Sequence, residues 1–173
     1  MSSEPQTQAS DPQTQTSDNQ PTPNFFVNLP AADPVAAAAF FTALGFTPIL
    51  AWNDAQTKSF RLPQPNERIC LMIHGPTRFK EFMRPDTDIV DAKKTTETLF
   101  SIMVDTRDEV DEWLARVTKA GGTLDPYKLA GYGEAMGLYS RSFTDLDGHI
   151  WEVVAMIKAG SCGGGGSGGS GDA

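Results

Sequence analysis

One carboxylate stands where the chain is otherwise apolar. Glu152 lies inside "HIWEVV", which follows the tight turn "DLDG". A charge removed from water is costly unless a partner compensates it. In a partly apolar cavity the pKa of Glu152 would be raised, which suits a general base or a polar anchor for a ligand. The alternative is a structural acid held by a backbone group or by Arg141 or Arg61.

Two more potential metal ligands stand in the apolar run "ICLMIH". Alternate residues of a strand face the same side of a sheet, so Cys70, Met72 and His74 are expected to share a face. The same count in "HIWEVV" puts His149 on the face opposite Glu152. Cys70, His74 and Glu152 would be suitable ligands for zinc. The alternatives are a small buried hydrophobe for Cys70 and a strand end near solvent for His74.

A first amphipathic helix must position these strands. Asp33 before Pro34 predicts its N-cap and first turn, and Gly45 predicts its end. Its expected core face is formed by Phe40, Phe41 and Leu44.

A second amphipathic helix begins at a predicted capping box. Thr106 and Glu109 have the required spacing, and Gly121 predicts the end of this helix. Its expected core face is formed by Val110, Trp113, Leu114 and Val117.

The chain repeats itself. The two N-caps are 73 residues apart, and the same interval sets Phe26 against Leu99 and Asn28 against Ser101. Each helix follows one extended apolar run, "NFFVNLPA" or "TLFSIMVD". Three strand-like pieces follow each helix: "FTPILAWN", "TKSFRLP" and "RICLMIH", then "GTLDPYK", "GLYSRSFT" and "HIWEVVAM". The pattern predicts an α+β fold of two tandem βαβββ modules.

The ends differ in composition from the middle. Residues 1–24 contain no aromatic or branched aliphatic side chain, which predicts a disordered tail, and residues 158–173 form a Gly/Ser-rich flexible tail with Cys162. The domain is expected over 25–157, with module one at 25–83, a linker at 84–96 and module two at 97–157.

Composition excludes several classes of partner. The net charge of −8 makes nucleic acid an unlikely ligand. No apolar run approaches the ~20 residues that span a membrane, and the polar start lacks the apolar stretch of a signal peptide. Two cysteines make no disulfide framework, so a cytoplasmic location is expected.

Several motifs together resemble a known superfamily. The unit from Asp33 to Phe46 and the motif Asp145-x-Asp147-Gly148-x-x-x-Glu152 resemble the vicinal oxygen chelate superfamily, which includes glyoxalase I, extradiol dioxygenases and bleomycin-resistance proteins. The details are most similar to a branch of predicted lactoylglutathione lyases. The resemblance implies a curved mixed sheet around a cavity, and a homodimer.

The resemblance also implies where a metal would bind. In metal-dependent members each half supplies one ligand from its first strand and one from its last, for Zn, Ni, Fe or Mn. Glu152 keeps the fourth position, whereas the first-strand positions carry Phe26 and Leu99. The remaining position falls on Cys70 or Met72. No metal is therefore expected; if one binds, its predicted ligands are Glu152, His74 and Cys70.

The leading functional prediction is an apolar cavity around Glu152 that binds a small organic molecule without a four-ligand metal centre. Whether the protein is an enzyme stays open; if it is one, Glu152 is the expected base. The alternatives are a metal-dependent glyoxalase-like lyase or dioxygenase, and a non-catalytic interaction module. The residues expected to contact the ligand are Phe26, Asn28, Met72, His74, Leu99 and Ser101.

Overall fold

The computed structural model describes residues 21–128, 133 and 136–157. The Gly/Ser tail with Cys162, and the predicted N-terminal tail up to residue 20, lie outside this part. The first module contains β1 (Phe25–Pro30), α1 (Pro34–Ala43), β2 (Thr47–Pro48), the 3₁₀ turn η1 (Leu50–Trp52), β3 (Thr57–Arg61) and β4 (Ile69–His74). Its sheet has the order β1-β4-β3-β2, in which only β1 and β4 run parallel.

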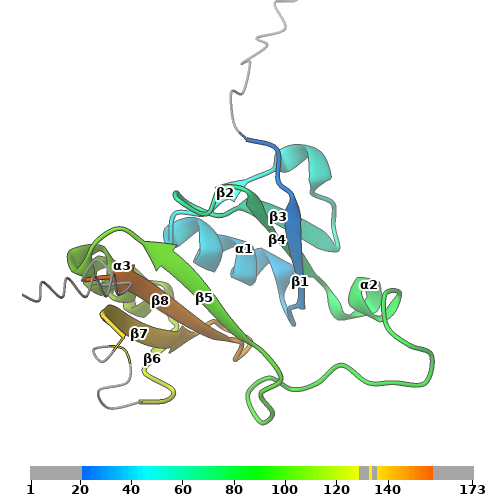
Figure 1. Ribbon diagram of the computed structural model, residues 1–173. Helices are drawn as coiled ribbons and strands as arrows, with labels where there is room; N and C mark the ends of the chain where they lie inside the picture. Colours follow the sequence, from blue (N-terminus) through cyan, green and yellow to red (C-terminus); the bar gives the residue numbers. More distant parts are fainter. Residues whose placement is uncertain (1–20, 129–132, 134–135, 158–173) are drawn as a thin grey trace, which may run out of the picture.

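The second module repeats this topology. It contains β5 (Leu99–Val104), α3 (Arg107–Ala120), β6 (Thr123–Leu124), β7 (Leu138–Thr144) and β8 (Ile150–Met156), and its sheet has the order β5-β8-β7-β6. The predicted α+β fold with tandem βαβββ modules is confirmed (Figure 1). The two four-stranded sheets remain separate and are not closed into one continuous sheet.

The first helix begins and ends where its sequence predicts. The Asp33 carboxylate accepts from the backbone N–H groups of Val35 and Ala36, at 2.9 and 3.1 Å. Gly45 has φ +97°, a left-handed conformation that glycine adopts at little cost. All three predicted core residues are buried: Phe40, Phe41 and Leu44.

The second helix, α3, has the predicted cap with one difference. Thr106 Oγ1 accepts from the Glu109 backbone N–H at 3.2 Å, but the Glu109 side chain reaches the backbone N–H of Asp105 instead of Thr106. Gly121 ends the helix with φ +93°. The predicted core face of Val110, Trp113, Leu114 and Val117 is buried.

Three local elements differ from prediction, and one of them is "GTLDPYK", of which only Thr123–Leu124 forms the strand β6. The segment "FTPILAWN" forms only the two-residue strand β2 and then η1. The Ile49 N–H still bonds to the Ser59 carbonyl in the register of β2 and β3, and the chain then turns at η1, where Ser59 bonds back to Trp52 and Asn53. The short helix α2 (Pro76–Lys80) was not predicted, and it lies where module one passes into the connecting segment. Among the described residues no helix has the length and apolar character needed to cross a membrane.

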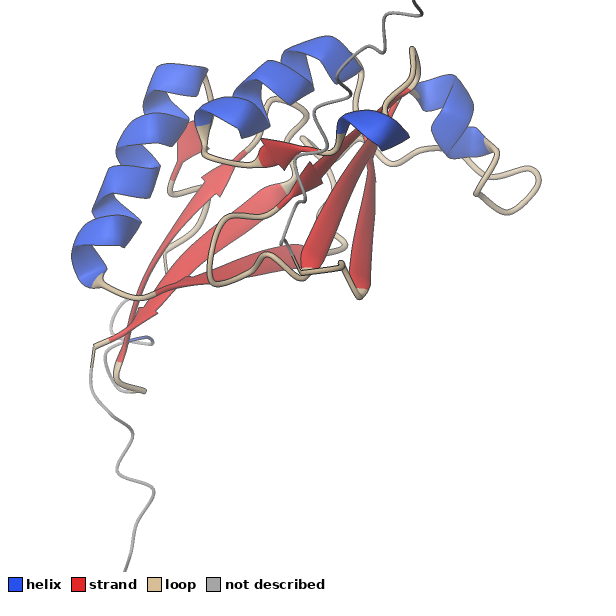
Figure 2. Cartoon of the chain, turned by 90° about the horizontal axis from the view of Figure 1, so that it is seen from above, coloured by secondary structure: helices blue, strands red, loops and turns tan. Residues whose placement is uncertain are grey.

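The core lies between the sheets and their helices, with Trp151 of β8 at its centre. Figure 2 shows α1 and α3 gathered on one side of the strands. The Trp151 indole contacts aromatic rings of both modules, with centroids 5.6 Å from Phe41, 6.4 Å from Phe46, 4.8 Å from Phe100 and 6.3 Å from Phe143. The two modules therefore share one aromatic core.

Candidate functional site

Strand register establishes which residues of the two modules are equivalent. Asn28 pairs with Met72 in the first sheet, and Ser101 pairs with Glu152 in the second. Since Asn28 and Ser101 are related by the 73-residue interval, Met72 is the counterpart of Glu152. This resolves the choice between Cys70 and Met72 in favour of Met72. By the same register, the counterpart of His74 is Val154.

His74 belongs to a closed network in module one. Its Nδ1 lies 3.1 Å from the Thr57 hydroxyl, and its Nε2 lies 3.0 Å from Asn28 Oδ1. A neutral ring satisfies both contacts, since Nδ1 accepts from Thr57 and Nε2 donates to Asn28. His74 is 2% exposed, so the expectation of a position near solvent is wrong. Phe79 and Phe82, which follow the strand, pack over the ring.

Burial lowers the pKa of His74, and the positive charge of Arg78 lowers it further. The ring therefore stays neutral at pH 7. Cys70, near the other end of the same strand, is fully buried, and burial raises the pKa of its thiol. Cys70 thus matches the small buried hydrophobe of the sequence analysis.

Glu152 is half-buried on the face of the second sheet that points away from α3. Its Oε2 accepts from the Ser101 hydroxyl at 2.8 Å. Burial raises the pKa of Tyr127 to about 12, and Glu152 contributes through its charge and a side-chain hydrogen bond. The Ser101 hydroxyl therefore holds this carboxylate by a direct hydrogen bond, and the Glu152 charge acts on Tyr127.

Neither arginine suggested as a partner of Glu152 pairs with it. Arg141 forms a bidentate contact with Asp125, at 2.9 and 2.8 Å, and Arg61 donates to the Pro21 carbonyl. The prediction of an arginine partner is wrong, because Arg141 lies on the opposite face of its strand, where it reaches Asp125.

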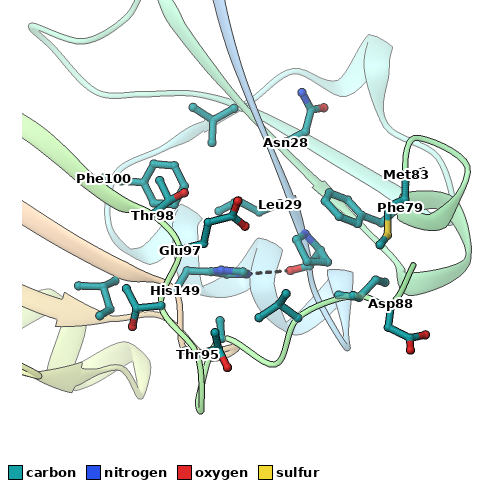
Figure 3. A pocket seen from close by; sticks show the side chains of 18 of the residues that line it. Asn28, Leu29, Phe79, Met83, Asp88, Thr95, Glu97, Thr98, Phe100 and His149 are labelled. Atoms are coloured by element: carbon teal, nitrogen blue, oxygen red, sulfur yellow. Dashed lines mark hydrogen bonds between the residues drawn. The ribbon is translucent and has the colours of Figure 1, made fainter. Parts of the chain in front are cut away.

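A cavity of about 640 Å³ lies between the edge strand β1 and the segment that connects the modules (Figure 3). One wall is β1 itself. The segment from Asp88 to Thr98 forms the opposite wall. Phe79 and Met83 contribute from module one, and Phe100 and Ile150 from module two.

The connecting segment is held in place as a wall. Asp91 accepts from the Lys93 backbone N–H at 3.0 Å, and its own carbonyl accepts from Lys94 and Thr95. The segment packs so closely on Gly148 that a Cβ atom there would lie 2.6 Å from Lys93 Cγ. The wall is therefore an ordered part of the fold.

The turn before β8 joins the two modules at the end of the cavity. The buried Asp145 carboxylate accepts from the backbone N–H groups of Asp147, Gly148 and His149, at 3.0 to 3.1 Å, and from the Trp151 indole at 3.1 Å. These hydrogen bonds fix the turn that carries His149. Its Nε2 donates to the Pro30 carbonyl at 3.0 Å, the contact drawn as a dashed line in Figure 3.

A second contact from this turn also crosses between the modules. Asp147 Oδ1 accepts from the Ala32 backbone N–H at 2.8 Å. The motif "DLDG" was interpreted from the sequence only as a turn. Asp147 and His149 could have been noted as polar groups without a local partner, but their partners are 115 and 119 residues away.

The predicted site residues fall into separate groups. Phe26 and Asn28 line the cavity, whereas the lining does not include Met72, His74, Leu99, Ser101 or Glu152. The structure brings Asn28 to His74, and Ser101 to Glu152. The described part of the chain contains no group of three or more His, Cys, Asp or Glu residues placed to hold a metal ion, so Cys70, His74 and Glu152 are not gathered. That these residues bind a ligand or a metal stays a prediction.

The comparison with protein families matches residues 25–153 to the Glyoxalase/Bleomycin resistance protein/Dioxygenase superfamily. The chain belongs to this superfamily. Among curated proteins, none matches it.

Solved structures share the fold. Hypothetical protein SA1046 from S. aureus is 25% identical, with a TM-score of 0.58 over 76% of this chain and 91% of that one. A lactoylglutathione lyase from Agrobacterium tumefaciens is 24% identical, with a TM-score of 0.55 over 78% and 94%. The fosfomycin resistance protein FosX from Listeria monocytogenes is 20% identical, with a TM-score of 0.51 over 76% and 87%.

The four positions that would hold a metal in metal-dependent members can now be tested on their chemistry. They carry Phe26, Met72, Leu99 and Glu152. Two of these side chains have no donor atom, and the thioether of Met72 suits soft metals only. The residues present do not fit the four-ligand centre.

Proposed function

We propose that this chain binds a small organic molecule in the cavity between its two modules, without a four-ligand metal centre. The observation that carries the proposal is the cavity of about 640 Å³ beside β1. Small-molecule sites usually enclose about 300–1,000 Å³ and combine an apolar lining with a few polar groups. Here Phe26, Leu29 and Phe100 supply apolar surface, and Asn28 and Glu97 supply polar groups.

Glu152 enters the proposal as a polar anchor beside the cavity. Ile150 lines the cavity, and Glu152 lies on the same face of β8, two residues or roughly 7 Å further along the strand. A ligand whose apolar body occupies the cavity reaches the carboxylate with a hydrogen-bond donor. If the protein catalyses a reaction, Glu152 is the base that this arrangement offers.

The open volume of the cavity is relevant to the alternative of a non-catalytic interaction module. An interaction module with no small-molecule role is favoured if the space around Glu152 is filled by side chains, and Glu152 lies beside the cavity and not in its lining. The space beside β1 is open to a ligand, which supports the pocket in preference to the interaction module.

The proposal includes a cytoplasmic homodimer. Phe25, Leu99 and Met103 on the edge strands β1 and β5 are 59%, 45% and 40% exposed, and apolar side chains at sheet edges are suited to cover by a second copy. Cys70 is a free thiol, as in reduced compartments. Light scattering at micromolar concentration measures the assembly state, and a monomer there would remove the dimer from the proposal.

The experiment that tests the pocket is a fragment screen by NMR with cavity-filling variants. Thr98→Trp puts an indole into the cavity wall and is expected to weaken binding at least tenfold, because it occupies ligand volume. The matched control is Thr77→Trp on the exposed surface of α2, which should bind fragments like the wild type. Fragments that bind both variants equally would contradict the pocket.

The same screen measures the role of Glu152. Glu152→Gln keeps the shape of the side chain and removes its charge. It is expected to weaken the binding of fragments that carry a hydrogen-bond donor severalfold and to leave the unfolding transition unchanged. If the same fragments bind equally well to this variant, Glu152 does not contribute to the site, and the proposal that the cavity binds the ligand still stands.

A further inference from the structure

The charged groups around the cavity have one sign. Of the side chains that line it, Asp88 and Glu97 are acidic, and no lysine or arginine of the described chain is among them. Asp88 is almost fully exposed and has Lys80 at 3.9 Å. Figure 3 shows the Glu97 side chain directed into the cavity. An anionic ligand would therefore meet like charge and no compensating cation.

The apolar lining is rich in aromatic rings, which is an independent observation. Phe25, Phe26, Phe79 and Phe100 contribute four phenyl side chains to the walls. Figure 3 shows Phe100 and Phe79 on opposite sides of the cavity, with Glu97 between them in that view. The faces of aromatic rings carry negative partial charge and attract cations within about 6 Å of the ring centre.

The neutral polar groups of the lining include both donors and acceptors, so the charge preference rests on the acids and the aromatic rings. Asn28 Oδ1 and the Pro30 carbonyl already accept from the two histidines. As an edge strand of the described chain, β1 bonds to another strand only on its β4 side, so both N–H and C=O groups of its outer side are free of a strand partner.

We propose that the ligand of this cavity is an organic cation, a substituted ammonium with an aromatic or aliphatic body, that Glu97 and the phenylalanine side chains select over neutral and anionic analogues. This inference rests on the proposed function, because it assigns a ligand class to the same cavity. Glu97 provides the charge contact, and the rings receive the alkyl groups of the ammonium. The connecting segment thereby contributes selectivity as well as a wall.

The test uses three probes of similar size and different charge: phenyltrimethylammonium, the uncharged tert-butylbenzene, and benzenesulfonate. Their dissociation constants are measured by NMR titration of the wild-type protein and of Glu97→Gln. Wild type should bind the cation about tenfold more tightly than the neutral probe, and the anion most weakly. Glu97→Gln should reduce the preference to about threefold, since the rings remain.

The matched control is Glu112→Gln, which removes an exposed acid of α3 outside the cavity lining and keeps the same net charge as Glu97→Gln. If this control reduces the preference as much as Glu97→Gln does, the selectivity comes from net charge and the inference is overturned. Equal affinities for all three probes, with Thr98→Trp still blocking them, would overturn the cation selectivity and leave the proposed function standing. If neither these probes nor the fragment screen finds binding that Thr98→Trp blocks, the proposed function and the inference both fail.

Discussion

The sheet faces that point away from the helices have the same strand topology in the two modules but different side chains at equivalent positions. At equivalent positions the first sheet presents Asn28 and Met72, and the second presents Ser101 and Glu152. In module one the buried His74 ring bonds to buried Thr57 and to the exposed Asn28. In module two a half-buried carboxylate accepts from the exposed Ser101.

The segments that lie over the two sheets also differ. In module one, η1 and the residues after α2 lie over the face: Ser59 Oγ donates to the Trp52 carbonyl at 3.3 Å, and Phe82 packs on His74. In module two the positions of Leu99, Ser101 and Met103 on β5 remain exposed. Duplication of a fold therefore preserves the positions and their exposure, since Asn28 and Ser101 are both exposed and Met72 and Glu152 are both half-buried, and the residue types at these positions set the difference in chemistry.

Substitutions on the helix-covered face of the same strands are expected to change the free energy of unfolding most. Trp151 is the counterpart of Leu71, and both are buried. Trp151→Ala should lower the free energy of unfolding by about 4 kcal/mol, because the indole joins the rings of both modules, and Leu71→Ala by about 3 kcal/mol. Urea unfolding measures both values. A larger loss for Leu71→Ala would show that the shared core is not centred on Trp151.

Substitutions at the two equivalent polar positions, Asn28 and Ser101, are expected to change the free energy of unfolding less. Asn28→Ala leaves the buried Nε2–H of His74 without its acceptor and should cost about 2 kcal/mol, whereas Ser101→Ala should cost about 0.5 kcal/mol because water can reach Glu152. The measurement is again urea unfolding of both variants. Equal costs would mean that the network in module one is as open to water as the face of module two.

The smallest effect is a pH dependence confined to module one. The folded pKa of His74 lies below its unfolded value of about 6.5, so the unfolded chain binds more protons as the pH falls below that value. The free energy of unfolding should therefore decrease from pH 7.5 to pH 5.5, and the loss should level off once the pH passes below the folded pKa. Val154, the counterpart in module two, cannot titrate.

Unfolding curves of the wild type and of His74→Gln at these two pH values separate this contribution from that of other groups. The decrease should be clearly smaller in His74→Gln, because glutamine keeps a polar side chain and does not titrate. An equal decrease in both proteins would assign the pH dependence to other groups.

Local sequence was sufficient for the elements. Asp33, Gly45, Thr106 and Gly121 act within one turn of their own position, so their residue types predict where the helices begin and end. The alternation along β4 and β8 likewise predicts which side chains share a face. The segment after Gly45 was predicted less well, because it turns at η1, where Asn53 and Trp52 accept from Ser59, six and seven residues away.

The sequence by itself determined the tandem modules, their helices and the place of Glu152 on its strand, because each depends on neighbours within a turn or on strict alternation. Only the tertiary structure decided that Glu152 is held by Ser101, that His74 is buried, and that the cavity lies beside β1 under the connecting segment. These features depend on contacts between residues far apart in the chain, such as His149 with Pro30. No local pattern records which distant partner a polar group will meet.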